Sequence, residues 1–376
     1  MNLTEAFRDA DLARRMATTI ATEVSPHRRY SLMEFCGGHT HTLARYGLEQ
    51  LLPGNVEMIH GPGCPVCVLP GGRIAAGIAL AQRPGVILCS YGDLLRVPAR
   101  HGATLMRTRA AGADVRMIYS TRDALAIAQR HPDREVVFFA IGFETTTPAT
   151  AVAVTEARRL GLQNFSVFCN HVLTPPAMSG ILAAPGGVAV QGFIGPGHVA
   201  SVIGSRPFER FAEQDGYPIV ITGFEALDLL QAIRQLIRQI NVGRAVLENE
   251  YRRVVSREGN EKALALIDEV FTLREDFEWR GLGRVAHSAL RLRDDFACFD
   301  AEARFALTVE DVPDHKACEC AAVLRGAIRP EQCKVFGTAC TPDNPLGSCM
   351  VSSEGACAAR YRYATRGVPR AGTEAV

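Results

Sequence analysis

Residues 136–147 read VVFFAIGFETTT and hold the unit that recurs through the first 222 residues. The apolar run Val136–Ile141 is rich in β-branched and aromatic residues and has the length of a buried strand. A polar loop that begins with Gly142 follows, and three threonines then stand where a helix would begin. The stretch therefore predicts a strand, a loop and a helix in that order.

Seven further runs of the same kind occur between residues 30 and 222: Tyr30–Phe35, Val56–Ile59, Val86–Cys89, Val115–Tyr119, Ser166–Cys169, Val188–Ile194 and Ile219–Thr222. Helix-compatible stretches separate them, and this alternation predicts βαβ units with parallel strands. Nearly every run ends in a glycine-bearing or polar loop. Because ligands bind at the carboxyl ends of strands in open α/β sheets, these loops are the expected functional positions.

The sequence contains a weak internal repeat. Gly61-Pro62-Gly63-Cys64 follows one predicted strand and Gly195-Pro196-Gly197-His198 follows another. Two related α/β domains with a break near residues 120–134 would explain the repeat, and chance similarity between Gly/Pro loops is the alternative.

The pattern changes after Thr222. Apolar residues recur at helical spacing from Ala226 to Ile240 and predict a long amphipathic helix that acts as a connector. A second helix is expected over Glu261–Phe271, and a Cys/Gly/Pro-rich tail follows.

Composition narrows the classes of function. Forty-one Lys and Arg against 40 Asp and Glu leave a formal charge of +1, which disfavours nucleic acid and anionic membranes as partners. No apolar run reaches the length of a membrane helix, and the first 24 residues carry no signal-peptide pattern, so we expect a soluble, cytoplasmic protein. Twelve cysteines in a reducing compartment indicate metal, cluster or redox chemistry more than a disulfide framework.

Six of the twelve cysteines lie between residues 318 and 357. Cys320, Cys333, Cys340 and Cys357 are separated by 12, 6 and 16 residues. Four thiolates that converge from loops can hold an iron–sulfur cluster. Structural zinc is the competing interpretation, although zinc ribbons usually bring paired ligands two to four residues apart. Cys318 and Cys349 are spare residues that could replace an assigned ligand.

Cys64-Pro65-Val66-Cys67 is a C-x-x-C motif at the start of a predicted helix. The helix N-terminus lowers the pKa of a thiol, so a reversible disulfide is expected. Half of a zinc site and two incidental cysteines are the alternatives, but no second C-x-x-C motif exists.

Cys36 follows a predicted strand directly and precedes Gly37-Gly38-His39-Thr40-His41. Its sulfur could serve as a nucleophile or as a ligand to a soft metal, and a structural cysteine is the plainer interpretation. Glu144 and Thr145 are expected to face the same crevice. Three other cysteines lie in or near apolar runs and are expected in the core: Cys89, Cys169 and Cys298.

In this order, the motifs closely resemble those of the HypD family of hydrogenase maturation factors. The resemblance covers residues 30–360 and rests on four pieces: Cys36–His41, Gly61–Cys67, Gly142–Thr146 and the Cys-x12-Cys-x6-Cys-x16-Cys tail. It implies an α/β fold with two similar Rossmann-like parallel-sheet domains and a helical or irregular iron–sulfur domain. We assign domain I to residues 30–120, domain II to 121–225, and the connector and [4Fe-4S] domain to 1–29 and 226–376.

The resemblance also implies an activity. The protein would work with a small HypC-type chaperone as the scaffold on which an iron atom acquires two cyanides and one carbon monoxide. A HypE-type partner would donate the cyanide, and the Fe(CN)2(CO) unit would pass to the large subunit of a [NiFe]-hydrogenase. This is an assembly scaffold with redox activity rather than a conventional turnover enzyme.

Residue roles follow from the same resemblance. Cys36 would bind the iron of the Fe(CN)2(CO) unit, Cys64 and Cys67 would form the redox dithiol, and the four tail cysteines would bind the [4Fe-4S] cluster. The remaining candidates could bond cyanide nitrogens or move protons: His39, His41, Glu144 and Thr145.

Two other classes of function stay open on the residues alone. A stand-alone [4Fe-4S]/dithiol oxidoreductase would need its own substrate pocket, and no G-x-G-x-x-G fingerprint for flavin or nicotinamide is present. A zinc-stabilised interaction module is the third class. Metal analysis with an absorption spectrum of anaerobically purified protein would separate all three.

Overall fold

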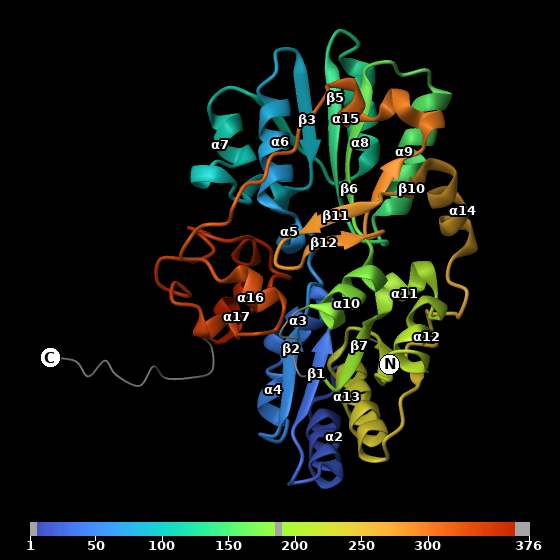
Figure 1. Cartoon of the computed structure of the whole chain (residues 1–376), viewed down its shortest axis with the longest axis vertical. Helices are drawn as coiled ribbons and strands as arrows, with labels where there is room; N and C mark the ends of the chain where they lie inside the picture. The colour runs from blue at the N-terminus through green and yellow to red at the C-terminus, as the bar shows by residue number, and fades with distance from the viewer. Residues whose placement is uncertain (1–5, 185–189, 365–376) are drawn as a thin grey trace, which may run out of the picture.

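The computed structural model describes residues 6–184 and 190–364, and within them two parallel sheets form the centre of the molecule (Figure 1). The first, sheet A, has the strand order β2 (Val56–His60), β1 (Tyr30–Glu34), β7 (Gly192–Pro196), β8 (Ile219–Thr222) and β9 (Leu247–Asn249). The second, sheet B, has the order β4 (Asp114–Met117), β3 (Val86–Ser90), β5 (Glu135–Gly142) and β6 (Phe165–His171).

The expected α/β fold class with two Rossmann-like parallel sheets is confirmed. Every neighbouring pair of strands in both sheets is parallel. Strands β1 to β8 correspond to the eight runs that the sequence predicts, except that residues 188 and 189 of the run Val188–Ile194 lie outside the described residues. The agreement is close because the strands are buried and therefore almost continuously apolar.

The division expected at residue 120 does not separate the two sheets. The chain builds β2 and β1 of sheet A, then all of sheet B, and returns to sheet A with β7. Leu32 of β1 pairs with Met58 of β2 on one edge and with Gly192 of β7 on the other. All five residues of β1 are buried, so β1 needs a neighbour on both edges.

Helices pack against these sheets: α2 (Ala10–Glu23), α3 (Gly37–Arg45), α4 (Leu48–Leu51), α5 (Pro65–Val68), α6 (Gly71–Ala81), α7 (Leu105–Ala110), α8 (Thr121–Arg130), α9 (Thr147–Arg159), α10 (Thr174–Ala183), α11 (Gly197–Ile203), α12 (Arg206–Glu213), α13 (Ala226–Asn241) and α14 (Glu261–Val270). The two helices predicted after Thr222 are therefore confirmed as α13 and α14. Helix α13 packs with α2 against sheet A, however, and shares one apolar core with Leu32 and Val220. It belongs to the sheet A layer and is not a free connector.

The cysteine-rich segment has little regular structure. It follows two hairpins, β10 (Phe271–Leu273) with β13 (Leu290–Leu292) and β11 (Asp276–Trp279) with β12 (Gly283–Ala286). Short helical turns then complete the described chain: η3 (Asp294–Phe299), α15 (Ala301–Arg304), α16 (Cys320–Leu324), η4 (Pro330–Gln332), η5 (Ser348–Met350) and α17 (Ala356–Ala364). Figure 1 shows α16 and α17 beside the junction of the two sheets, next to α5 and α3.

None of the helices in the described parts of the chain is long and apolar enough to cross a membrane.

Candidate functional site

Three neighbouring strands of sheet A end at the same edge of the sheet. Cys36 comes two residues after β1, Cys64 follows β2 and His198 follows β7. Because β1 lies between β2 and β7, the loops after β2 and β7 flank Cys36 on both sides. The two similar motifs Gly61–Cys64 and Gly195–His198 are therefore the two loops that flank this cysteine.

Cys36 is held by a buried carboxylate. Its backbone N–H donates to Glu34 Oε2 at 2.7 Å, and the Thr40 hydroxyl and His60 Nδ1 both contact Oε1 of the same carboxylate. Glu34 is fully buried and Cys36 is 1% exposed. Burial, together with the nearby Glu34 charge, raises the pKa of the Cys36 thiol well above its usual value. A free thiol is therefore expected at neutral pH, and a cation that binds the sulfur would have to displace the proton.

His198 is the closest side-chain partner of the Cys36 sulfur. The Sγ of Cys36 lies 3.5 Å from His198 Nδ1 and 3.6 Å from Nε2. Burial lowers the pKa of His198 to about 4, so the imidazole is neutral at pH 7 and carries a proton on only one of its two ring nitrogens. His198 was not among the residues predicted for the site, although the repeated Gly-Pro-Gly motif directly before it pointed to its loop.

Phe224 lies between two histidines. The His39 ring stacks on it with centroids 4.9 Å apart, and the His198 ring lies 4.8 Å from it. His39 is buried, with Nε2 2.9 Å from the Gly223 carbonyl, and burial lowers its pKa to about 3. The His39 side chain therefore contacts Phe224 and the Gly223 carbonyl, while the His39 backbone N–H is directed at the Cys36 sulfur.

Two glycines allow the loops to approach Cys36 closely. A Cβ on Gly63 would lie 2.3 Å from the Cys36 nitrogen, and a Cβ on Gly38 would lie 3.0 Å from the Phe224 ring. Only glycine leaves room for the backbone of one loop to pass the other at Gly63.

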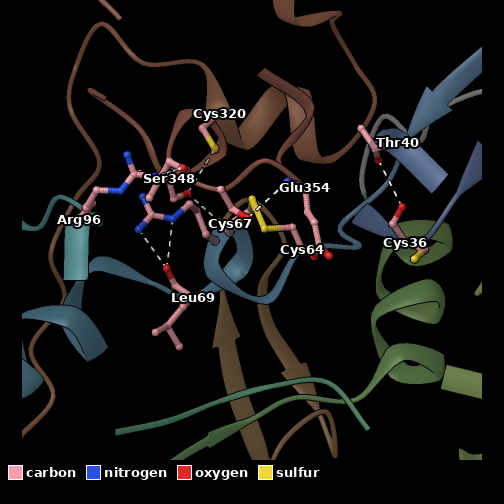
Figure 2. Close-up of a disulfide and its surroundings, with 12 residues drawn as sticks. Cys36, Thr40, Cys64, Cys67, Leu69, Arg96, Cys320, Ser348 and Glu354 are labelled. Carbon is pink, nitrogen blue, oxygen red and sulfur yellow. Dashed lines mark hydrogen bonds between the residues drawn. A yellow bond between two sulfur atoms is a disulfide. The ribbon is translucent and has the colours of Figure 1, made fainter. Parts of the chain in front are cut away.

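Cys64 and Cys67 form a disulfide, with Cα atoms 5.2 Å apart. The bond joins the first residue before α5 to the third residue of that helix. Ser348 contacts both Cys67 and Cys320. Its hydroxyl donates to the Cys67 carbonyl at 2.9 Å, and its Oγ lies 3.6 Å from Cys320 Sγ. In Figure 2 the disulfide lies between Cys320 on one side and Cys36 on the other.

A pocket of about 480 Å³ lies between the loops of sheet A and the loops of sheet B. Cys64 and His198 line it from sheet A, Thr145 and Thr146 from the loop after β5, and Glu354 from the cysteine-rich segment. The structure therefore brings Cys64, Thr145, His198 and Glu354 to one pocket. Burial raises the pKa of Glu354.

Five other candidates do not line this pocket in the described structure: Cys36, Cys67, His39, His41 and Glu144. Glu144 is buried, and its carboxylate accepts the Thr174 N–H at 2.7 Å and the Thr174 hydroxyl at 2.9 Å. Burial raises the pKa of Glu144 to about 7. His41 contacts Tyr363 of α17, with Nε2 3.3 Å from the phenol oxygen. Glu144 therefore fixes the start of α10, and His41 helps to attach α17 to α3.

Six cysteines surround a second, small cavity, which we call the cysteine cavity: Cys318, Cys320, Cys333, Cys340, Cys349 and Cys357. The Leu346 N–H points at Cys340 Sγ from 3.4 Å. A hydrogen bond from Cys318 lowers the pKa of Cys320, which favours a thiolate there. Soft sulfur donors around one cavity, with a backbone N–H directed at a sulfur, fit an iron–sulfur cluster. The four predicted ligands line the cavity together with the two spare residues.

No three His, Cys, Asp or Glu side chains among residues 6–184 and 190–364 lie close enough to share a single metal ion. The thiols are spread around the cysteine cavity instead.

The remaining cysteines are separate from both sites. Cys89 and Cys169 are buried in sheet B, as expected. The expectation of a core position is wrong for Cys298, which is exposed. It lies in η3, whose buried residues Phe296 and Phe299 are three apart and occupy one face of a three-residue turn, so Cys298 faces solvent.

The chain matches a family model described as "HypD: Hydrogenase formation hypA family" over residues 11–364. It is 59% identical over 368 residues to the Hydrogenase maturation factor HypD of Cupriavidus necator, covering 96% of this chain and 97% of the relative. It is 61% identical over 367 residues to the HypD of Azotobacter vinelandii, with coverage of 96% and 97%. The HypD of Escherichia coli is 47% identical over 336 residues, with coverage of 89% and 90%.

Proposed function

Since this chain belongs to the HypD family and has a role in hydrogenase maturation, we propose that it is the scaffold on which the Fe(CN)2(CO) unit of a [NiFe]-hydrogenase is assembled. A HypC-type chaperone would share the iron, a HypE-type protein would donate cyanide, and the hydrogenase large subunit would receive the finished unit. The observation that carries the proposal is the meeting of Cys36, the Cys64–Cys67 disulfide and His198 at one edge of sheet A.

Cys36 suits the role of iron ligand. A thiolate is a soft donor, and low-spin iron that carries cyanide and carbon monoxide is a soft acceptor. The neutral His198 ring lies close enough to hydrogen-bond the sulfur and adds no positive charge beside an incoming iron cation. The buried Glu34 carboxylate fixes the Cys36 backbone, so the sulfur is oriented before iron arrives.

Thr145 offers a hydroxyl group in the same pocket as Cys64 and His198, while the Thr146 hydroxyl donates to the Phe143 carbonyl at 3.1 Å. Hydroxyl donors can bond the nitrogen of a cyanide ligand. We infer that Thr145 orients a cyanide ligand, and that His39 acts through Phe224 by holding His198 in place.

The Cys64–Cys67 pair suits a redox role. Oxidation of the dithiol to the disulfide releases two electrons and two protons, and the reverse step consumes them. The dithiol would supply electrons to the assembly chemistry at Cys36, one loop away. A reducing cytoplasm is the compartment in which such a dithiol can be regenerated.

Cys320, Cys333, Cys340 and Cys357 would hold a [4Fe-4S] cluster in the cysteine cavity, where it would supply one-electron transfer when bound. Ser348 connects this cavity to the dithiol helix, because its hydroxyl touches both Cys320 and the Cys67 carbonyl. The residues therefore fit the group.

Anaerobic copurification with the HypC-type chaperone tests the proposal. Infrared spectra of the complex should show cyanide and carbonyl stretches, and metal analysis should find iron beyond the amount that a [4Fe-4S] cluster accounts for. A complex with the cluster but with no such stretches would support the stand-alone oxidoreductase instead.

A further inference from the structure

A basic cavity of about 1100 Å³ lies beside the cysteine-rich segment. Residues 96–107 line one side, and residues 312–317 and 342–346 line the other. It shares no lining residue with the pocket that contains Cys64 and His198. The proposed assembly site therefore leaves this second opening without a role.

The basic cavity has an excess of positive charge. Five Arg or Lys side chains and two Asp side chains line it, an excess of three positive charges, whereas the whole chain has a formal charge of +1. Arg100, Arg107 and Lys316 form no ion pair with another residue in the described ranges. Unpaired cations around a concave surface attract anionic partners, and salt screens that attraction.

Two chain segments that line the basic cavity also contribute to or contact the cysteine cavity. Lys316 lines the basic cavity, and Cys318, two residues later, lines the cysteine cavity. Leu346 lines the basic cavity and donates its N–H to Cys340 Sγ at 3.4 Å. A partner seated in the basic cavity would therefore touch the segments that hold the cysteine cluster.

Arg280 links the same cavity to the disulfide. It lines the basic cavity, and its Nη2 donates to the Leu69 carbonyl at 2.9 Å. Leu69 directly follows α5, the helix that contains Cys67. Arg280 is itself paired with Asp314, so it acts as a structural link while the unpaired cations remain available to a partner.

Apolar groups between the charges favour a protein as the occupant. Met106 is 49% exposed at the cavity, and Pro98, Pro313 and Pro345 give its walls a fixed backbone. Exposed apolar side chains beside charged ones are common at protein interfaces. The volume is also at the upper limit for a small-molecule pocket.

We propose that the basic cavity is the docking site of an acidic one-electron carrier protein, which supplies the electrons that reduce the Cys64–Cys67 disulfide. The proposal rests on the redox role proposed above for this pair. Two reduced carriers would deliver two electrons, two protons would come from solvent, the S–S bond would break and two thiols would form. Each carrier would leave in its oxidised state.

Binding can be measured without any assembly activity. The probe is a plant-type [2Fe-2S] ferredoxin, an acidic one-electron carrier, titrated into the full chain at low and at physiological salt. We expect the dissociation constant to rise about tenfold or more with salt, and the variant Arg100→Glu/Arg107→Glu to bind at least about tenfold more weakly at low salt. Arg100→Glu alone should show a smaller loss in the same direction.

The chain offers a matched control for the charge reversal. Arg15 on α2 and Arg122 on α8 are exposed and do not line the basic cavity. The variant Arg15→Glu/Arg122→Glu has the same net charge as the test variant and should bind the ferredoxin like the wild type. Equal weakening in both variants would mean that only net charge matters, and it would overturn the proposal.

Carbodiimide cross-linking locates the contact, because the sequence contains only three lysines: Lys262, Lys316 and Lys334. We expect the ferredoxin carboxylates to couple mainly to Lys316, with Lys262 on α14 as the internal control. Even coupling across the three lysines would overturn the proposal. A second outcome would also overturn the proposal: ATP abolishes the cross-link at matched ionic strength, and the ferredoxin shows no salt-dependent binding. That result would assign the cavity to a small anion.

Reduction by dithionite separates this proposal from the proposed function. Dithionite needs no docking site, so it should reduce the disulfide equally in wild type and in Arg100→Glu/Arg107→Glu. If dithionite yields two free thiols at Cys64 and Cys67 but ferredoxin binding ignores the charge reversal, the docking site is wrong and the redox role stands. If dithionite yields no thiols in wild type, the redox role itself fails.

Discussion

The sulfur of Cys36 lies 3.5 Å from Nδ1 of His198, although 162 positions separate the two residues in the chain. The contact joins the ends of β1 and β7, which are neighbours in sheet A. It gives the Cys36 thiol a neutral imidazole partner in a buried site. The pairing exists only because the chain returns to sheet A after building sheet B.

Cys36→Ala should abolish the cyanide and carbonyl stretches of the complex with the HypC-type chaperone while leaving the fold and the tail cluster intact. The substitution removes one soft ligand and a small buried volume, so we expect a loss of only about 1 kcal/mol in the free energy of unfolding. Infrared spectroscopy and cluster absorption on the same sample measure both effects. Cys169→Ala, a buried cysteine of sheet B, is the control and should keep the stretches. Stretches that persist in Cys36→Ala would place the iron on another ligand.

Cys64 and Cys67 should cycle between dithiol and disulfide while Cys36 stays a single thiol. The Cα atoms of the pair are 5.2 Å apart, within the range that a disulfide spans without backbone movement. Mass mapping of alkylated thiols in graded redox buffers follows each cysteine separately. A Cys36–Cys64 bridge as the main oxidised species would show that the roles are assigned incorrectly.

Anaerobically purified protein should be brown and contain about four irons in the cysteine cavity. Single Cys→Ser variants of all six lining residues decide which four are ligands. We expect loss of the visible absorption for Cys320, Cys333, Cys340 and Cys357, and retention for Cys318 and Cys349. If Cys318→Ser loses the absorption and Cys320→Ser keeps it, Cys318 is the ligand. Zinc without iron would refute the cluster.

Gly63→Ala should lower the free energy of unfolding by about 2 to 3 kcal/mol, because the new Cβ would lie 2.3 Å from the backbone nitrogen of Cys36 and the loop would have to move. Gly54→Ala is the matched control. A Cβ at Gly54 meets no atom within 4 Å, so the change should stay within about 0.5 kcal/mol. Urea denaturation measures both variants. Equal stabilities would mean that the loop after β2 adapts freely to a side chain at residue 63.

Glu144→Gln should flatten the pH dependence of stability. Burial raises the pKa of Glu144 to about 7 in the folded chain, above the ordinary value of 4.5. Between these values the folded state holds a proton that the unfolded state has lost, so the free energy of unfolding falls as pH rises from 5 to 8. Glutamine cannot ionise, and it can still accept the Thr174 N–H and donate to the Thr174 hydroxyl. Urea denaturation at both pH values should show a fall larger in wild type by on the order of 3 kcal/mol. Parallel falls would show that Glu144 stays ionised when folded.

The sequence by itself determined the strands and the cysteine motifs. Buried parallel strands must be apolar along their whole length, so runs such as Val136–Ile141 are visible without any structure. The spacing of Cys64 and Cys67 is local, and a disulfide across two residues depends only on the start of one helix. The crowding of six cysteines in the tail likewise indicated a shared cavity before any contact was known.

Only the tertiary structure decided which loops meet. Strand order depends on pairing between segments far apart in the chain, and neither composition nor periodicity encodes that β1 pairs with β7. For this reason the sequence placed the domain boundary near residue 120, expected Glu144 to face the crevice, and did not select His198 or Glu354. Side-chain direction at a strand end is set by neighbouring loops: Thr174 holds the Glu144 carboxylate toward α10, while the Phe224 ring packs at a tilt against the ring of His198 next to Cys36.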